Sequence, residues 1–248
     1  MGICTLHFFS KAMRLALAVL LPVLPLFASA AEPPTYSISI VPQFSAQQLL
    51  EEWQPLLKRV GDEAGVRFNL RFYPTIPAFE NGFLHGEADF VFVNPYHVVL
   101  ARQKQGYVPL LHDRQPLTGI LVVASGSPVK TLRDLDGKKI AFPAPNAFGA
   151  SLYMRALLAE QAKIKIEPSY VNTHANVYRQ VALGEVAAGG GVNQTFEDQP
   201  AELRARLRKI FETPAAAPHP LCAHPRVTAE VRRRVIACLL YTSLSPRD

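Results

Sequence analysis

The sequence predicts an α/β protein of two lobes, each a mainly parallel sheet flanked by helices, hinged by two crossover segments. Two observations support this fold class. Short apolar strands alternate with amphipathic helices in two separate stretches of the chain, and this alternation is typical of parallel sheets with right-handed crossovers. The length of 248 residues is enough for two lobes of about 100 residues each.

The first 30 residues are predicted to be a cleavable secretory signal rather than part of the fold. Lys11 and Arg14 precede an apolar run over residues 15–27, and residues 28–30 form an A-x-A cleavage site. The apolar run is short for a membrane span, and no cysteine stands directly after the cleavage site to carry a lipid anchor. With Met1 or Met13 as the start, we expect a mature periplasmic protein that begins at residue 31.

The mature chain is only mildly basic. Without residues 1–30, which hold two basic and no acidic side chains, 24 Lys and Arg face 20 Asp and Glu, a net charge of +4. Part of the excess lies in the runs 204–209 and 232–234, whose spacing is helical and typical of solvated helix faces. Nucleic acid is therefore not an expected partner.

The first lobe is predicted over residues 31–114, with roughly 221–237 returning near the hinge. Its strands are rich in β-branched and aromatic residues, and its helices end at Gly65, Gly86 and Gly106. In chain order, the expected strands and helices are 36–41, 46–64, 66–72, 78–85, 88–93 and 96–105.

The second lobe is predicted over residues 115–220, where strand–turn–helix units recur after a change of rhythm. The expected elements are strand 119–125, a helical turn at 132–137, strand 139–142, helix 148–161, strand 169–171, helix 175–183 and strand 187–192. Crossovers are expected near 111–119 and within 213–220. Sequence identity between the halves is negligible, so the architecture repeats without a sequence repeat.

Polar and aromatic residues follow the strands in both predicted lobes. After a buried strand comes Asn94-Pro95-Tyr96-His97, in which Pro95 ends the strand and suits the first turn of a helix. Similar positions follow other strands, namely Phe44, Thr75, Asn146, residues 172–174 and Asn193. Because α/β folds bind ligands beyond the carboxyl ends of strands, these residues predict a small-ligand site in a cleft between the lobes.

Several motifs together resemble one protein family. The segments "GEADFVFVNPYH", "LRDLDGKKIAFPAP", "YVNTHANVYRQVALGE", "AGGGV" and "PHPLCAHPRV" are similar to those of the periplasmic phosphate/phosphite/phosphonate-binding proteins of ABC transporters. The similarity covers nearly all of residues 35–236. It implies the type II periplasmic binding protein fold, a small anionic ligand, and an ABC transporter permease in the inner membrane, or a sensor kinase, as the partner of a monomer.

The oxyanion ligand that the resemblance implies suits the predicted helix starts. Free N–H groups and the positive end of the helix dipole stabilise a nearby anion by about 0.3–2 kcal/mol. Such starts are predicted at residues 146–151, after Thr75 and after Thr173. The candidate ligand-binding residues are Phe44, Thr75, Asn94, Tyr96, Asn146, Gly149, Ser151, His174 and Tyr178. His97 is expected to be structural.

The sequence also departs from the family pattern. Ala147, Phe148 and Ala150 stand where phosphonate binders usually carry Ser or Thr, and Ala187 stands where they commonly carry Asp. An acidic residue there would bind the amino group of an aminophosphonate or a ligand proton. The expected cleft is also aromatic, which would suit an organic ligand or a different anion.

Two further functions stand beside transport. A ligand-sensing periplasmic module that signals to a membrane protein without transport is the main alternative. An enzyme on the same fold lacks support, because the sequence shows no Ser-His-Asp arrangement, nucleophile elbow or H-E-x-x-H motif. No metal or other cofactor is expected.

The end of the chain, "CLLYTSLSPRD", resembles translated sequencing-adapter sequence, so residues 238–248 are predicted to be a non-native tail. In that case Cys222 is a lone thiol. If Cys238 is native instead, the two cysteines could pair in an oxidising periplasm.

Overall fold

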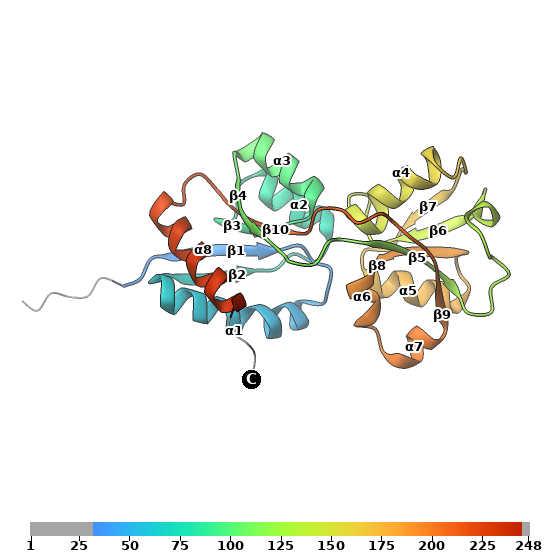
Figure 1. Ribbon diagram of the computed structural model, residues 1–248, viewed down its shortest axis with the longest axis horizontal. Coiled ribbons are helices and arrows are strands. Elements are labelled where there is room, and N and C mark those ends of the chain that lie inside the picture. The colour runs from blue at the N-terminus through green and yellow to red at the C-terminus, as the bar shows by residue number, and fades with distance from the viewer. Residues whose placement is uncertain (1–31, 245–248) are drawn as a thin grey trace, which may run out of the picture. The chain divides into compact units, whose positions relative to one another are not determined.

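The computed structural model describes residues 32–244, with side chains described through residue 241. The predicted signal peptide and the last four residues of the predicted tail lie outside this range. No helix among the described residues is long and apolar enough to cross a membrane. The described part of the chain forms two five-stranded sheets, each covered by helices on both faces (Figure 1).

The first sheet takes most of its strands from the N-terminal part of the chain. Their order is β2 (Arg67–Arg71), β1 (Thr35–Ile40), β3 (Phe90–Phe92), β10 (Pro220–Ala223) and β4 (Val108–His112). One face is covered by α1 (Ala46–Ala64) and α8 (Ala229–Leu244), the other by α2 (Ile76–Leu84) and α3 (Pro95–Gln105). Side chains alternate along each strand, so Phe90 packs in the α1 layer and Val91 in the α2 layer.

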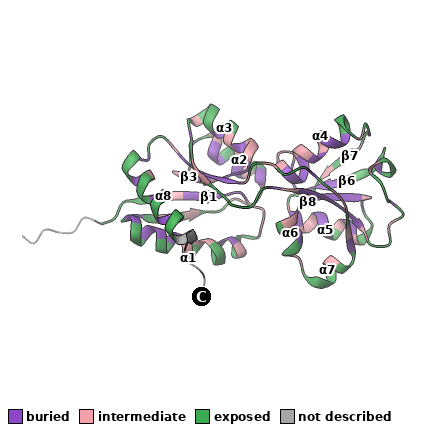
Figure 2. Cartoon of the chain, viewed as in Figure 1, coloured by how far each residue is buried: buried purple, intermediate pink, exposed green. Residues whose placement is uncertain are grey.

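The second sheet is built in the same way. Its order is β7 (Glu167–Tyr170), β6 (Lys139–Phe142), β8 (Ala188–Val192), β5 (Gly119–Ala124) and β9 (Leu207–Glu212). One face carries η1 (Leu132–Leu135), η2 (Phe148–Leu152) and α4 (Tyr153–Glu160). The other carries α5 (His174–Leu183), α6 (Asn193–Glu197) and α7 (Ala201–Ala205). The strands are buried between helices whose outer faces are exposed (Figure 2).

Each sheet contains one strand that runs against the rest. β10 is antiparallel to both β3 and β4, and β5 is antiparallel to both β8 and β9, while the other strands of each sheet share one direction. The predicted fold class, two lobes with mainly parallel sheets, is confirmed. The segments that link the sheets pair with each other, since Leu117 and Ala216 form an antiparallel bridge.

Short polar residues set the starts of the long helices. Ser45 begins α1 with a capping box in which its Oγ and the side chain of Gln48 each bond the other's backbone N–H. Gly65 ends the same helix in the left-handed conformation, φ 66°, which favours glycine. Thr75, Asn94 and Thr173 begin α2, α3 and α5 with side-chain caps as well, so the helix starts follow directly from the sequence.

The structure bears on three local expectations, of which the first was wrong. The basic run 204–209 does not continue as a helix, because β9 starts at Leu207 and pairs with β5. The helix expected from residue 148 does begin there, and its first turn is the wider π-helical turn η2. Cys222 is a buried free thiol, as expected of a lone cysteine, and the alternative disulfide with Cys238 is not formed.

Candidate functional site

Strand-end residues of the two lobes meet directly. Asn94 Nδ2 donates to the backbone oxygen of Asn146 at 3.0 Å, and Asn146 Nδ2 donates to Glu80 Oε2 at 3.3 Å. Asn94 and Glu80 belong to the first lobe, and Asn146 follows β6 in the second. An apolar cluster that contains Val93 and Ala147 spans the same contact. Asn94 and Asn146, two of the residues that the sequence predicts for the ligand site, therefore lie where the lobes touch.

Asn94 reaches this contact because it is the N-cap of α3. Its Oδ1 accepts the N–H of His97 at 2.8 Å, which turns Nδ2 toward Asn146. The residue is only 2% exposed. Tyr96 follows Pro95 in the first turn of the same helix, and it is half-buried. Both predicted residues thus come from the start of one helix.

Thr75 and Phe44 differ in what their side chains do. Thr75 is the half-buried N-cap of α2, and its Oγ1 accepts the N–H of Ala78 at 3.2 Å. A hydroxyl that accepts in this way can still donate its own proton to a ligand oxygen. Phe44 is half-buried and packs against the apolar cluster beneath α1. Thr75 therefore offers a polar group, whereas Phe44 offers only apolar surface.

The second-lobe segment from Asn146 to Ser151 lies close to the sheet. Gly149 is buried so near to β5 that a Cβ on Gly119 would lie 2.1 Å from the backbone oxygen of Gly149. Ser151 is fully buried, and its Oγ accepts from Arg155 Nε at 3.3 Å. The same guanidinium donates to the backbone oxygen of Pro145 at 2.8 Å. Asn146 is thus at the interlobe contact, whereas the Ser151 hydroxyl is engaged within its own lobe.

His174 is the first residue of α5 and is 1% exposed. Its Nδ1 lies 3.1 Å from Thr195 Oγ1, and its Nε2 has no hydrogen-bond partner among the described residues. Burial, with a smaller effect of the nearby His219, lowers the pKa of His174 to about 3. The imidazole is therefore neutral in the native protein.

Tyr178 lies in the core of the second lobe. It is fully buried, and its hydroxyl is 2.8 Å from Thr195 Oγ1 and 3.3 Å from the backbone oxygen of Val192. Burial raises the pKa of this phenol. The ring fits because Gly191 has no side chain, since a Cβ there would lie 2.1 Å from the Tyr178 hydroxyl. The structure therefore does not bring Tyr178 together with Asn94 and Asn146.

Glu80 was not among the residues expected from the sequence. Its Oε1 lies 2.9 Å from His97 Nε2, and its Oε2 accepts from Asn146. His97 is fully buried between Phe79 and Phe83, with ring centroids 5.9 and 5.3 Å away, as expected of a structural residue. The missed signal was a carboxylate four residues after a buried apolar residue of the same helix, which places it on the buried face.

His219, just before β10, is a second buried imidazole near the contact. Its ring stacks on Phe92 with centroids 5.7 Å apart, and its Nε2 has no partner among residues 32–241. Burial and the neighbouring His97 lower the pKa of His219 to about 4, against the opposing effect of Asp113. The interlobe region therefore gathers neutral imidazoles.

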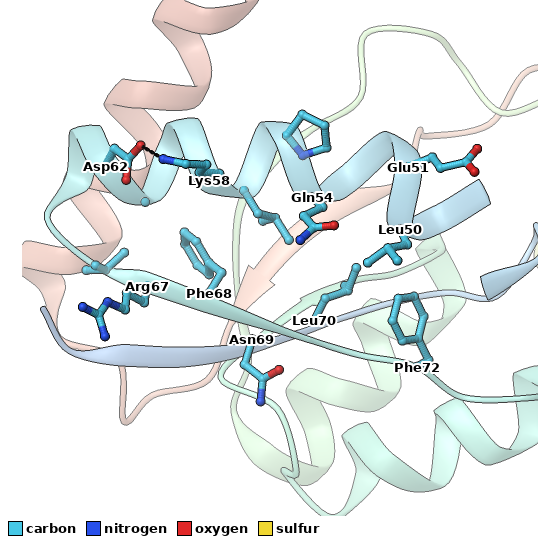
Figure 3. Close-up of a pocket in the computed structure, with 14 residues that line it drawn as sticks. Leu50, Glu51, Gln54, Lys58, Asp62, Arg67, Phe68, Asn69, Leu70 and Phe72 are labelled. Carbon is cyan, nitrogen blue, oxygen red and sulfur yellow. Dashed lines mark hydrogen bonds and ion pairs between the residues drawn. The ribbon is translucent and has the colours of Figure 1, made fainter. Parts of the chain in front are cut away.

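Two surface cavities lie away from this region. One of about 660 Å³ runs between α1 and the edge strand β2, lined by Leu50, Phe68 and Phe72 among others (Figure 3). Another of about 590 Å³ lies at the other end of the second sheet, beside Ser127 and Lys139. The first cavity is lined only by first-lobe residues and the second only by second-lobe residues, so neither lies between the lobes.

The chemistry of the contact region suits hydrogen bonding to a small polar ligand. The side chains gathered there offer amide and imidazole groups, with the Glu80 carboxylate as an acceptor. Within residues 32–244, no group of three or more His, Cys, Asp and Glu is placed to hold a metal ion.

Comparison with known proteins gives a consistent result. The family model described as "ABC transporter, phosphonate, periplasmic substrate-binding protein" matches residues 38–248. The chain is 20% identical over 227 residues to the phosphate-import protein PhnD of Mycolicibacterium smegmatis, a match that covers 80% of this chain and 69% of that protein.

Solved structures share the fold. PhnD1 from Prochlorococcus marinus, in complex with methylphosphonate, superposes with a TM-score of 0.75 at 16% identity and covers 84% of each chain. A binding component of an ABC phosphonate transporter from Pseudomonas aeruginosa gives a TM-score of 0.72 at 16% identity, over 82% of this chain and 72% of that one.

Proposed function

Because the chain belongs to the phosphonate family of ABC-transporter periplasmic substrate-binding proteins, we propose that it holds a small phosphate-, phosphite- or phosphonate-like oxyanion between its two lobes. The observation that carries this proposal is the direct meeting of Asn94 from one lobe with Asn146 from the other. In a type II binding protein, a ligand bound at such a contact favours the closed state over the open one, since it bonds to both lobes.

In this proposal the oxyanion is bound by uncharged hydrogen-bond donors. The N–H groups at the starts of α2, α3 and α5 carry partial positive charge, and the Thr75 hydroxyl adds a donor. The neutral His174 offers its unpartnered Nε2 beside the start of α5. Hydrogen bonds to an ionised ligand are stronger than neutral ones, so several of them hold an oxyanion without a full counter-charge.

The ligand-binding set follows from these placements. Asn94, Tyr96, Asn146 and His174 form its centre in our proposal, with Thr75, Gly149 and Phe44 around it. Ser151 and Tyr178 support the second-lobe wall from within, since both are fully buried and bonded inside their lobe. The named ligands of the relatives, phosphate for one and methylphosphonate for another, define the first ligands to test.

The family also sets the cellular role. A periplasmic component of an importer delivers its ligand to a permease in the inner membrane, and we propose that this chain does so as a monomer without catalysing a reaction. In this proposal residues 1–30 are removed on export, the first lobe spans 31–114 with 221–237, and the second spans 115–220. The family match favours transport over a sensing role.

Calorimetric titration with phosphate, phosphite and methylphosphonate tests this function. Wild type should bind at least one of them, and His174→Ala and Tyr96→Ala should each weaken that binding about tenfold, the effect of one hydrogen bond to a charged group. His85→Ala is the control, because His85 is exposed at the end of α2. Equal affinities in wild type and both variants would remove these residues from the site, and no binding of any of the three anions would refute the ligand class.

A further inference from the structure

Glu80 occupies an unusual place for an acidic residue. It lies in the second turn of α2, and its side chain is only 15% exposed. Each carboxylate oxygen has its own donor: Oε1 lies 2.9 Å from His97 Nε2, and Oε2 lies 3.3 Å from Asn146 Nδ2. One donor comes from its own lobe and the other from the opposite lobe.

The contact on the first-lobe side is buried. His97 is held by the rings of Phe79 and Phe83 and by its backbone bond to the N-cap Asn94. Burial lowers the pKa of His97, although the Glu80 carboxylate opposes this, so the imidazole is neutral and bonds the carboxylate through its Nε2–H. Glu80 therefore has a bond within its own lobe that does not depend on the second lobe.

Among the described residues, Asn146 makes the contact on the second-lobe side. Its backbone oxygen accepts from Asn94, and its side-chain amide donates to Glu80. Both partners belong to the first lobe, so these bonds exist only while the lobes touch. Asn146 directly precedes the segment that leads into α4, and its position sets how that segment approaches the first lobe.

From these contacts we infer that Glu80 is a positioning residue for closure, which receives the Asn146 side chain as the lobes come together. The inference rests on the proposed function. A bond made only in the closed state shifts the open–closed equilibrium, and every ligand that requires closure gains the same factor in affinity. Glu80 thus acts on affinity through Asn146, and it does not select between ligands.

The first experiment compares Glu80→Ala with Glu87→Ala. Glu87 is an exposed carboxylate of the same lobe that bonds Arg71 and Tyr73, away from Asn146. Removing Glu80 should weaken binding of phosphate and methylphosphonate about tenfold each, as for a lost bond to a charged group, with the ratio of the two affinities unchanged. Glu87→Ala should leave both affinities as in wild type. Equal affinities in the two variants, or a changed ratio, would overturn the inference.

A double-mutant cycle separates closure from a general structural role. If Glu80 acts through Asn146, Glu80→Ala combined with Asn146→Ala should weaken binding much less than the product of the two single effects. Additive effects would contradict the inference. Glu80→Gln keeps the volume but offers one acceptor oxygen where the carboxylate offers two. It should fall between wild type and Glu80→Ala, and it serves in the cycle if the alanine variant does not fold.

A measurement without ligand keeps the inference distinct from the proposed function. If wild type binds none of the anions, the proposed function fails. Small-angle scattering can still measure how far apart the lobes lie on average. Ligand-free Glu80→Gln should be more open, with a larger radius of gyration, than wild type and Glu87→Gln. An unchanged radius would refute the role of Glu80 whether or not a ligand is known.

Discussion

The two lobes have the same sheet topology but different side chains in their cores. The strand orders of the two sheets, β2-β1-β3-β10-β4 and β7-β6-β8-β5-β9, correspond position by position. The fourth strand of each sheet, β10 or β5, is antiparallel to its neighbours and is the first strand that the chain forms after it crosses from the other lobe. The central strands, β3 and β8, differ in sequence. β3 is Phe-Val-Phe, whereas β8 contains the consecutive glycines 189–191. The same topology therefore accommodates a bulky strand in one lobe and a glycine-rich strand in the other.

The glycines determine how the second lobe forms its wall. A Cβ on Gly190 would lie 2.1 Å from the backbone oxygen of Ala150, and one on Gly189 would lie 2.4 Å from the Val177 side chain. Backbone thus packs directly on backbone at η2. In the first lobe, by contrast, Phe79 and Phe83 fill the corresponding space with side chains. One lobe positions its helix starts by close backbone approach, and the other by side-chain packing.

The buried imidazoles differ in the same sense. His97 in the first lobe has the Glu80 carboxylate as a partner, which opposes the effect of burial on its pKa. His174 in the second lobe has no carboxylate partner among the residues that the structure describes, and its pKa falls to about 3. Each of the two imidazoles has one ring nitrogen without a partner among the described residues, so the lobes differ in the carboxylate that only His97 contacts.

The largest expected effect is a loss of stability in mild acid. Below pH 6.5 the unfolded chain binds protons at His174 and His219, while the folded protein does not until its pKa values of about 3 and 4 are reached. Unfolding is then favoured as the pH falls from 6.5 toward 4, by up to about 1.4 kcal/mol per pH unit for each group. Urea unfolding at a series of pH values measures this slope.

Replacing single histidines sharpens the contrast between the lobes. His174→Gln should flatten the pH dependence more than His97→Gln, because Glu80 already opposes the lowering of the His97 pKa. Equal slopes for the His97 and His174 variants would show that the carboxylate partner makes no difference.

A methyl group at Gly190 gives the next largest effect. Gly190→Ala should destabilise the protein by about 3 kcal/mol, as overpacking does, because the nearest atoms to the new Cβ include a backbone oxygen and the Phe142 ring. Gly126→Ala is the matched control, since a Cβ on Gly126 would meet no atom within 4 Å. Denaturant midpoints measure both. Equal midpoints would mean that the close approach of β8 to η2 does not contribute to the stability of the second lobe.

The fold was predictable where the signal was local. Apolar periodicity identified most strands and helices, and short polar residues marked the helix starts at Thr75, Asn94 and Thr173. β9 was missed because it is an edge strand whose charged residues resemble a solvated helix face, and only its pairing with β5 makes it a strand.

The site was less predictable, because it depends on contacts between distant segments. Asn94 and Asn146 were identified from strand ends, but their bond joins residues 52 positions apart. Tyr178 lies four residues after His174 on the same helix face, so periodicity alone could not separate them. The glycines of β8 decide the outcome, since they let α5 approach closely enough to bury the phenol. Glu80 carries no local signal for its partner in the other lobe.

The smallest expected effect compares two caps. Thr75 accepts the Ala78 N–H at 3.2 Å in the first lobe, and Thr173 accepts the Asn176 N–H at 3.1 Å in the second. Alanine at either position should lower the free energy of unfolding by about 1 kcal/mol, while serine should retain most of it. Because local hydrogen bonds of the same geometry begin both helices, the two losses should agree in urea titrations. A much larger loss at Thr173 would mean that the cap and the tight packing of α5 on β8 act together, and the lobes would then differ even where their sequences use the same device.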